Sequence, residues 1–492
     1  MTLKVAVLAD LGQDIYHAGD EAMGHAAADE LRNRGLEVLL LSRNPEQTER
    51  LFGLKSTPTL AFPWPPAERE DYLRRIKAHL SGSSELPPGD PALELIRALE
   101  ECDGVVIAGG GNLNSRFGWL LFERAAVVAI ARSLDKPVVI SGQTLGPQLS
   151  AADTLVLTDL LTEAELVSVR EQASADLVHR LGVPAVAGLD DASFLAASDA
   201  ESAGHSIDVP GPGYVAVTVA PYSGPGSPEG FYSRLGTELD ALYRRTGKPA
   251  VFLPHLGAAS GNGWDPSAHA RIAVAMSSPF RQYPVLTARE TAALTAGAAL
   301  VVTTRYHPAV FALSHAVPVV GLAVDNYSGV RLAGVMANWG LEDFVLPLPG
   351  LQDGLLAGSL AEAWERRSEI SAHLAAALPS RKAWSKQWWD SAAAVFMEGS
   401  AASAAPADLA PVTAFPAAGQ WAGAARALGR GFYARSAMQG QYDVEEDRLT
   451  SHLGQMDREL ASLRAEHQKL ADSRTVKTAL ALHRVYAKLR RR

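Results

Sequence analysis

The residues best suited to chemistry lie in short polar loops that follow apolar runs. The most specific of these loops is Thr303-Thr-Arg-Tyr-His-Pro308, which leads from an apolar run into a helical one. Pro308 fits the first turn of a helix, where its missing N–H is no loss, so Arg305, Tyr306 and His307 are expected at a helix N-terminus. A guanidinium binds phosphate or carboxylate through two hydrogen bonds, and an imidazole exchanges protons near neutral pH. The loop predicts an anion site with an acid–base group; a capping arginine beside a structural histidine is the alternative.

Three further segments have the composition of ligand-binding turns. One is His17-Ala-Gly-Asp-Glu-Ala22, which opens a helical stretch whose amides suit an anion or a sugar oxygen, although Asp20 is also a typical N-cap. Two are Gly109-Gly-Gly-Asn-Leu-Asn114 and Ser141-Gly-Gln-Thr-Leu-Gly-Pro147, whose glycines permit close approach to a ligand or simply tight turns. Their spacing matches neither a dinucleotide-binding fingerprint nor a P-loop. Arg170 follows another short apolar run and offers a second anion contact, unless it forms a surface salt bridge.

These loops need elements that hold them on one side of the molecule. Short apolar runs alternate with helical stretches over most of the chain, which predicts βαβ units and parallel sheets. A Gly/Pro-rich stretch at 204–213 separates two such halves. We therefore expect an α/β fold of two Rossmann-like domains, residues 1–203 and 204–350, that face each other across a cleft. Ligands of such sheets bind beyond the carboxyl ends of the strands, where all of these loops lie.

The chain changes character beyond Val317–Val324, the last strand that the pattern predicts. Helices over 351–397 should pack back across both domains, because three closely spaced tryptophans there are typical of interdomain packing: Trp384, Trp388 and Trp389. Residues 398–440 are rich in Ala, Pro, Gly and Ser and predict a flexible linker. Residues 441–492 predict an amphipathic helix.

That last helix has two features. A heptad pattern over 449–470 predicts either a short coiled coil that joins copies of the chain or a helix packed on its own enzyme. The heptad positions are Leu449, Leu453, Met456, Leu460, Leu463, His467 and Leu470. Residues 474–492 hold seven Lys and Arg and no acid. Such a tail can lie on an anionic membrane surface, or it is simply a solvated basic end.

Composition excludes several classes of protein. The 492 residues carry a net charge of −9, which argues against a nucleic-acid binder. A single cysteine, Cys102, rules out an intramolecular disulfide framework and a multi-cysteine zinc site, and no other ligand cluster demands a metal. The apolar windows are shorter than a membrane span, and the N-terminal residues lack a signal-peptide pattern. We expect a cytoplasmic protein, peripheral at the inner face of the membrane if its tail binds lipid.

Taken together, the motifs resemble those of the polysaccharide pyruvyl transferase family over about residues 1–345. The segments that carry the resemblance are Gly19-Asp20, Gly109–Gly111, Gly142–Pro147, Val169–Ser174, Asp190–Phe194, Arg305–His307 and the stretch Phe311–Gly321. The resemblance implies a fold like that of the two-domain glycosyltransferases of the B type. It implies transfer of a pyruvyl group from phosphoenolpyruvate to two hydroxyls of a sugar, giving a cyclic ketal and phosphate. The acceptor would be a cell-envelope glycan or its lipid-linked precursor, and no cofactor is needed.

The resemblance also implies roles for individual residues. The donor site would be formed by Arg170, Arg305, Tyr306, His307 and Arg331, and the acceptor would contact His17, Asp20, Asn112 and Gln143 on the opposing half. Arg305 and Arg170 would hold phosphate and carboxylate, and a protonated His307 would be the general acid. Ser328 stands about where family members often carry a lysine, with Arg331 nearby as a substitute. His255 is a spare catalytic candidate, or a hydrogen-bonded loop histidine.

Two other functions fit the same sequence. The first is a nucleotide-sugar glycosyltransferase of the B-type fold, although no convincing acidic residue for base and ribose stands at the expected strand end. The second is a non-catalytic scaffold of glycan assembly that acts through its heptads.

Overall fold

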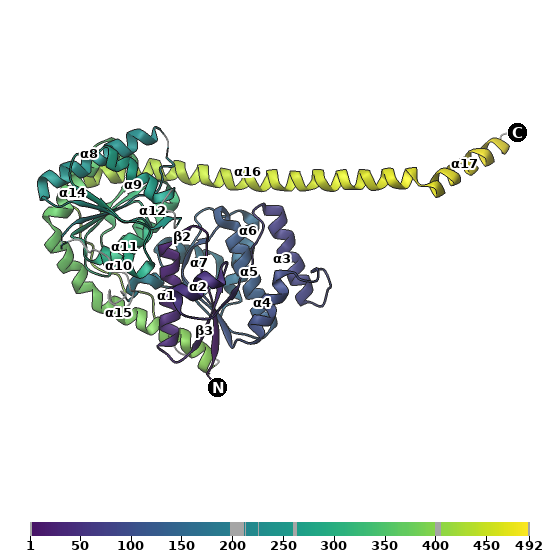
Figure 1. Cartoon of the computed structure of the whole chain (residues 1–492), viewed down its shortest axis with the longest axis horizontal. Coiled ribbons are helices and arrows are strands. Elements are labelled where there is room, and N and C mark those ends of the chain that lie inside the picture. The colour runs from purple at the N-terminus through teal and green to yellow at the C-terminus, as the bar shows by residue number, and fades with distance from the viewer. Residues whose placement is uncertain are drawn as a thin grey trace.

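The computed structural model describes residues 2–196, 211, 213–224, 226–258, 263–398 and 405–490. They form two α/β domains, a long helix that crosses both of them and a C-terminal helix that extends away from them (Figure 1). The interdomain linker expected at 204–213 lies, apart from residues 211 and 213, outside the described residues.

The N-terminal domain is built on a parallel sheet. Its strands are β1 (Lys4–Leu8), β3 (Glu37–Ser42), β4 (Ser56–Pro58), β5 (Gly104–Ile107), β6 (Gly110–Leu113), β7 (Val138–Leu145), β8 (Leu166–Val169) and β9 (Val186–Ala187). The helices are α1 (Ala18–Arg32), α2 (Pro45–Phe52), α3 (Pro66–Leu80), α4 (Pro91–Glu100), α5 (Gly118–Ser133), α6 (Ala151–Thr162) and α7 (Gln172–Leu181), with 3-10 turns η1 (Ser115–Phe117) and η2 (Asp191–Phe194). The strand order is β4-β3-β1-β5-β7-β8-β9, and β6 pairs with β7. Because both faces are covered, the central strands are almost continuously apolar.

The C-terminal domain repeats this plan. Its strands are β10 (Val215–Thr218), β11 (Ala250–Phe252), β13 (Phe280–Gln282), β14 (Leu300–Thr303), β15 (Val319–Ala323) and β16 (Val345–Pro347). Its helices are α8 (Pro228–Thr246), α9 (Trp264–Val274), α10 (Ala288–Ala296), α11 (Tyr306–Leu313), α12 (Asn326–Ala337), α13 (Pro349–Gln352) and α14 (Leu355–Glu365), with the 3-10 turn η3 (Glu342–Phe344). The order β13-β11-β10-β14-β15-β16 is the 3-2-1-4-5-6 order of a Rossmann sheet, and the N-terminal sheet begins in the same order.

Two sequence predictions about the sheets were wrong. The strand expected to be last, Val317–Val324, is followed by β16, which pairs parallel to β15. The glycine-rich segment after β5 is not only a turn: β6 pairs parallel to β7, with Gly110 opposite Gln143. Glycines lower strand propensity, so the pattern predicted a loop at Gly109–Gly111, whereas β16 was missed because it is only three residues long. The close pairing of β6 with β7 fixes the positions of the polar residues in both segments.

A short antiparallel ladder joins the two domains. Strand β2 (Tyr16–His17) pairs with β12 (Leu256–Gly257), so that His17 lies opposite Leu256. The next amide, Ala18 N–H, donates to the carbonyl of His255 at 2.8 Å. The N-terminus of α1 is thereby fastened to the C-terminal domain, next to the carboxyl ends of both sheets.

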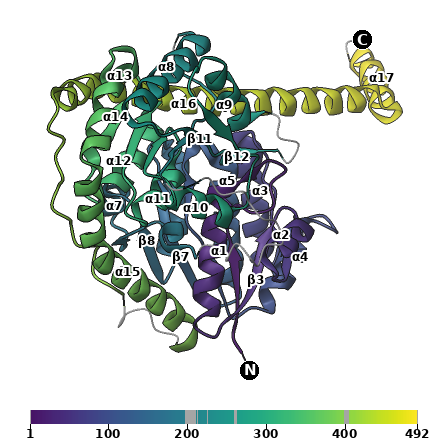
Figure 2. The same ribbon diagram turned by 60° about the vertical axis from the view of Figure 1, so that its left-hand side comes forward.

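The helix α15 (Arg367–Glu398) packs back across both domains, as the sequence predicted (Figure 2). Its first half contributes Ile370 and Leu374 to the core of the C-terminal domain. Its second half brings the three tryptophans into a cluster with strands of the N-terminal domain. The indole N–H of Trp388 donates to Ser141 Oγ at 2.8 Å, so this helix supports the strand that carries the Gln143 segment.

The flexible linker expected at 398–440 was wrong in two respects. Residues 405–418 form a strap that hydrogen-bonds to both domains, for example through Leu409 N–H to Ala187 O and Phe415 N–H to Gly340 O. From Gln420 the chain is helical, in α16 (Gln420–Asp472) and then α17 (Arg474–Leu489). The first turns of α16 are buried on the C-terminal domain through Trp421 and Phe432, because apolar residues recur there at helical spacing.

The distal part of α16 and all of α17 project beyond the domains (Figure 1). The heptad segment begins beside the N-terminal domain, where His452 and Arg458 pair with Glu70 and Glu68 of α3. Its apolar side chains are exposed, including Leu453 and Leu463 at 62% each. Within the described part of the chain, no helix combines the length and the apolarity needed to cross a membrane.

Candidate active site

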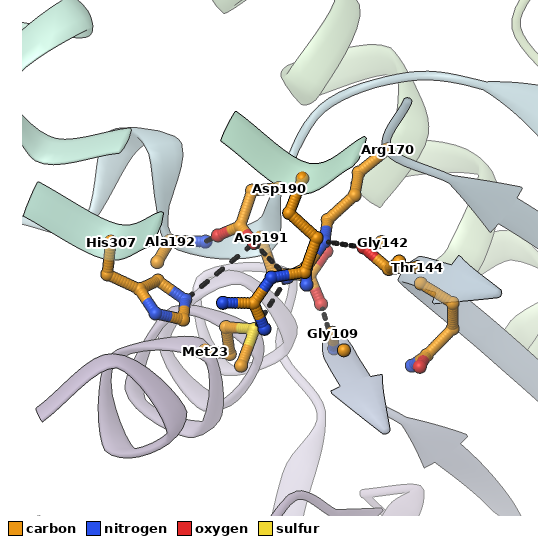
Figure 3. A network of polar contacts seen from close by, with 12 residues as sticks. Met23, Gly109, Gly142, Thr144, Arg170, Asp190, Asp191, Ala192 and His307 are labelled. Atoms are coloured by element: carbon orange, nitrogen blue, oxygen red, sulfur yellow. Dashed lines mark hydrogen bonds and ion pairs between the residues drawn. The ribbon is translucent and has the colours of Figure 1, made fainter. Parts of the chain in front are cut away.

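Arg170 is the most firmly held charge at the carboxyl ends of the strands. It follows β8 directly and is fully buried. Its Nη1 lies 2.5 Å from Asp190 Oδ2, its Nε donates to Thr144 Oγ1 at 2.8 Å, and its guanidinium lies 4.3 Å from the centroid of the Tyr306 ring (Figure 3). Nη2 has no hydrogen-bond partner among the described residues. The side chain is thus a fixed cation with one donor left for a ligand.

A second arginine approaches from the other domain. Arg331 lies on α12, and its guanidinium stacks on the Tyr327 ring at 4.4 Å and lies 5.1 Å from the centroid of the Tyr306 ring. Its Nη1 donates to the Tyr327 hydroxyl at 2.6 Å, which in turn donates to the carbonyl of Gly111 at 2.5 Å. These contacts tie the start of α12 to β6 across the domain boundary.

The two guanidiniums converge on the α-carbon of Gly111. A Cβ atom built there would lie 2.7 Å from Arg331 Nη1, 2.9 Å from Arg170 Nη2 and 2.9 Å from Tyr327 Oη. Any side chain would occupy the space between the two cations, which explains the glycine sterically. Two guanidiniums and a phenol around one point suit a small ligand with several anionic oxygens.

His307 is held beside this point. It lies in the first turn of α11, with Pro308 next to it as the sequence predicted. Its ring is buried, and Nε2 lies 3.8 Å from Asp190 Oδ2 without a hydrogen-bond partner among the residues described (Figure 3). A Cβ on Gly19 would lie 1.9 Å from Nδ1, so α1 can pass the imidazole only because this residue is glycine.

The charge state of His307 follows from its surroundings. Burial lowers the pKa of His307 well below 6.5, and the neighbouring charges of Arg170 and His17 lower it further. The imidazole is therefore neutral at pH 7 in this structure. Protonation, which the role of general acid requires, would need additional negative charge beside the ring.

His17 and Asp20 extend the cluster from the N-terminus of α1. His17 is the N-cap residue, and its Nδ1 lies 2.9 Å from Asp20 Oδ2. Its ring meets that of His307 edge to face, with centroids 6.2 Å apart. Burial raises the pKa of Asp20, but His17, Arg331 and Arg170 together outweigh burial and hold the pKa below its usual value. Asp20 is therefore ionised, with two arginines and a histidine around it.

Asn112 and Gln143 place two amide oxygens side by side. Gln143 uses its N–H groups within the protein, donating to Ala108 O at 2.6 Å and Ser141 O at 3.0 Å. Its Oε1 and the Oδ1 of Asn112 are buried and have no partner in the described part of the chain. Both oxygens lie next to Gly110, whose Cβ would be 3.1 and 2.9 Å from them. They are acceptors suited to a hydroxyl group.

Arg305 has a different partner from the one expected. Both Nε and Nη2 lie near Asp265 Oδ1, at 3.2 and 2.5 Å, and the other oxygen of this buried carboxylate accepts from the amides of His255 and Leu256. Burial lowers the pKa of His255 and of His269, and the Arg305 charge adds to the effect. Arg305 thus braces the loop that pairs with β2, while Arg170 and Arg331 are the arginines beside His307.

His255 lies under α11, next to the Phe311 ring at 5.7 Å between centroids. Burial holds its pKa well below 6.5, with His17 and Arg305 adding to the effect. Neither ring nitrogen has a hydrogen-bond partner among the residues that the structure describes. It is a neutral imidazole within the same histidine group as His307 and His17.

Asp191 supports the site from beneath. Its carboxylate accepts from Ser141 Oγ at 2.5 Å and from Gly109 N–H at 2.6 Å. Burial raises its pKa to about 7 despite these hydrogen bonds. Asp191 thus connects the ends of β5 and β7 with the α15 tryptophan that also binds Ser141.

Sequence reasoning gave no site role to several residues that the structure brings to the cluster, namely Thr144, Asp190, Asp265 and Tyr327. Asp190 follows β9 closely, and Tyr327 follows β15, so the rule that ligands bind beyond strand ends could have found both. Thr144 and Asp265 act by binding an arginine, and no local pattern predicts such a pairing. Among the described residues, no group of three or more His, Cys, Asp or Glu is arranged to hold a metal ion.

Comparisons with known proteins identify the family of this chain. A family model described as polysaccharide pyruvyl transferase matches residues 17–326. The amylovoran biosynthesis protein AmsJ of Erwinia amylovora is 22% identical over an alignment of 399 residues that covers 74% of this chain and 93% of that protein. The family match includes Gly111, Arg170, Asp190 and His307, and it ends just before Tyr327.

Two solved structures with the same fold contain a nucleotide or a nucleotide sugar. One is S. aureus MnaA with UDP, at 11% identity and a TM-score of 0.53, covering 83% of this chain and 100% of that one. Another is the UDP-GlcNAc 2-epimerase of Neisseria meningitidis bound to UDP-GlcNAc, at 13% identity and a TM-score of 0.50, covering 76% and 94%. At this identity the likeness shows the fold alone, which is the two-domain, glycosyltransferase B-like fold that the sequence predicted.

Proposed function

The chain belongs to the polysaccharide pyruvyl transferase family, and we propose that it transfers a pyruvyl group from phosphoenolpyruvate to two hydroxyls of one sugar in a cell-surface polysaccharide or its precursor. The products would be a cyclic pyruvate ketal and phosphate. The observation that carries the proposal is the convergence of Arg170 and Arg331, from different domains, on Gly111 beside His307.

Phosphoenolpyruvate matches this convergence in charge. Its carboxylate and its phosphate are attached to the same carbon, so two cations must approach from different sides. Arg170 is immobilised by Asp190 and Thr144 and offers Nη2, while Arg331 is oriented by Tyr327. Such preorganised donors bind without rearranging, which favours the charge that develops during reaction.

The reaction needs a proton at C3 and a sugar oxygen at C2. The first hydroxyl adds to C2 while C3 receives a proton; phosphate then departs, and the second hydroxyl attacks C2 and loses its proton. The bound trianion would raise the pKa of His307 by offsetting the charges of Arg170 and Arg331. A protonated His307 would then be the acid for C3, and the neutral imidazole could take a hydroxyl proton.

The sugar would approach from the face formed by His17, Asp20, Asn112 and Gln143. Asp20 is ionised, and the two amide oxygens have no hydrogen-bond partner among the described residues, so all three groups can bind hydroxyl hydrogens. Arg305 would hold the loop that pairs with β2 in place, because its guanidinium is bound to Asp265. Tyr306 would act through its ring, which lies against both Arg170 and Arg331.

The C-terminal helices have proposed roles of their own. The exposed heptads of α16 would pair with the same helix of a second copy, because buried leucine seams stabilise coiled coils. The basic, amphipathic α17 would lie on an anionic membrane surface and bring the enzyme to a lipid-linked acceptor.

The proposed reaction is tested by incubating the full-length protein with phosphoenolpyruvate and the glycan fraction of cells that produce it. Inorganic phosphate and pyruvyl ketal, detected by mass spectrometry of the glycan, should form in equal amounts. Arg331→Gln should abolish both, while Arg97→Gln, an exposed arginine on α4, should change neither. Transfer of a sugar from a nucleotide sugar by the same protein would instead establish a glycosyltransferase.

A further inference from the structure

A cavity of about 890 Å³ lies between the two domains and α16, and neither the family resemblance nor the residues of the donor site account for it. One wall comes from the loop before α3 and the start of α5, another from the starts of α12 and α13. The third wall is α16, which contributes residues from Phe432 to Arg448. This third wall lies outside the segment 17–326 that matches the family model.

A row of aromatic rings runs from the outer edge of this cavity to the donor site. Trp64 is 63% exposed and stacks on Trp119 with centroids 4.1 Å apart. Phe117 follows, 5.6 Å from the Trp119 ring and 5.8 Å from the Tyr327 ring. Tyr327 is the residue that binds both Arg331 and Gly111. The first three rings line the cavity, and the fourth belongs to the donor site.

The polar lining of the cavity is balanced in charge. It contains four arginines and four aspartates and no other charged residue: Arg69, Arg116, Arg435, Arg448, Asp153, Asp325, Asp443 and Asp447. A site for a polyanion or a lipid phosphate would carry excess positive charge. Balanced donors and acceptors suit a ligand that is rich in hydroxyls and carries little net charge.

Gln148 shows that some polar groups in the lining of this cavity lack hydrogen-bond partners among the described residues. Its side chain is 6% exposed and lines the cavity, and its Oε1 has no hydrogen-bond partner among the described residues. The Nε atoms of Arg69 and Arg448, also in the lining, are likewise unpartnered in the part of the chain that the structure describes. Buried polar groups normally find partners, so these atoms are available to a ligand.

We propose that this cavity binds the sugar residues of the glycan acceptor that adjoin the sugar to be modified. The apolar faces of pyranose rings pack on aromatic side chains, while their hydroxyls bind carboxylates, amides and guanidiniums. The aromatic row would guide the chain from Trp64 toward Tyr327, and the α16 wall would select among glycans. The inference rests on the proposed function, because it assumes that the donor binds beside Tyr327.

The test uses the full-length protein and the glycan fraction of the producing cells, with binding measured by calorimetry. Trp64→Ala should weaken glycan binding by about tenfold or more, as truncation of a stacked tryptophan commonly does. The same variant should leave the dissociation constant of phosphoenolpyruvate unchanged. Trp264→Ala is the matched control, since Trp264 is also exposed, at 47%, and does not line the cavity.

A second pair of variants tests the α16 wall without touching an aromatic residue. Asp447→Ala should weaken glycan binding, and Glu446→Ala, an exposed neighbour outside the lining, should not. Equal glycan affinity in wild type, Trp64→Ala and Asp447→Ala, or no glycan binding by wild type, would overturn the inference. Failure of the wild-type protein to bind phosphoenolpyruvate would instead contradict the proposed function. The experiment therefore distinguishes failure of this inference from failure of the proposed function.

Discussion

Nη1 of Arg170 lies 2.5 Å from Oδ2 of Asp190, and both side chains are almost completely buried. Taking two charges out of water is costly, and their mutual attraction often only offsets that cost. The ion pair therefore adds little to the free energy of unfolding, but it holds the Arg170 guanidinium in one orientation. Its value lies in directing Nη2 toward Gly111.

The first prediction concerns removal of one partner of this pair. Asp190→Ala should lower the free energy of unfolding by about 3–5 kcal/mol, because the buried Arg170 charge loses its closest partner and keeps only Glu171, whose Oε2 lies 3.8 Å from Nε. Denaturant unfolding measures the loss. Asp176→Ala, at an exposed position on α7, should have little effect, and an equally small loss in Asp190→Ala would contradict a buried charge that depends on Asp190.

The second prediction concerns Gly111→Ala. The added methyl would lie within 3 Å of Arg331 Nη1, Arg170 Nη2 and Tyr327 Oη, at the point where the donor is proposed to bind. Because the Arg331 end can shift, the fold should persist while phosphoenolpyruvate affinity falls about tenfold or more, as expected for loss of a charged hydrogen bond. Gly423→Ala, which meets open space on α16, is the control for calorimetric titration.

The third prediction concerns proton uptake by His307. Its pKa is well below 6.5 in the free protein and should rise when the trianion binds. Between the free and bound pKa values, each binding event then takes up a proton, and affinity increases as the pH falls. Titrations in buffers of different ionisation enthalpy measure this uptake. His307→Gln should abolish the proton uptake, and His483→Gln, exposed on α17, should leave it intact. Equal uptake in both variants would show that His307 is not the group that takes up the proton.

The fourth prediction concerns Glu21, which is buried on α1 and whose pKa burial raises to about 7. Below pH 4.5 the carboxyl is protonated in both folded and unfolded states, so no free energy of unfolding is lost. As the pH rises through the pKa of Glu21 in the folded state, ionisation of the carboxyl favours the unfolded state. The free energy of unfolding then falls by about 3 kcal/mol. The free energy of unfolding of Glu21→Gln should not fall in this way, so the variant should be more stable than the wild type above pH 7.

Unfolding by denaturant at pH 4 and pH 8 distinguishes the outcomes. The exposed Glu46→Gln on α2 is the control and should follow the wild type. A stability difference between wild type and Glu21→Gln that does not change with pH would show that Glu21 ionises normally in the fold.

The fifth prediction concerns self-association through α16. Leu453→Glu combined with Leu460→Glu places charge on the heptad seam and should convert a dimer into a monomer in sedimentation equilibrium. Gln455→Glu with Ser462→Glu adds charge at the same spacing on another face and should leave the dimer intact. A monomeric wild-type protein would contradict the proposal that α16 forms a coiled coil between two copies of the chain.

The sequence was informative wherever a residue follows a buried strand. Apolar runs predicted both sheets, and the strand-end rule placed Arg170 and His307 on the same side of the molecule. Arg331 also proved to lie beside them. The pairing of β6 with β7 was missed, because glycine-rich segments read as turns and only long-range backbone hydrogen bonds reveal the strand.

The pairing of Arg305 could not be predicted for a related reason. Arg305 and Asp265 are 40 residues apart, on the segment after β14 and on α9, and only the tertiary fold brings them together. The same holds for Tyr327 and Gly111, which lie in different domains. Local patterns identify charged side chains at strand ends, but tertiary packing decides which of them remain available to a ligand.

Donor binding is tested most directly by a calorimetric titration of the full-length protein with phosphoenolpyruvate, with and without the glycan fraction, and separately with nucleotide sugars. We expect one phosphoenolpyruvate to bind per chain, at least about tenfold more weakly in Arg331→Gln and with unchanged affinity in Arg97→Gln. Binding of a nucleotide sugar without any binding of phosphoenolpyruvate under either condition would contradict this expectation.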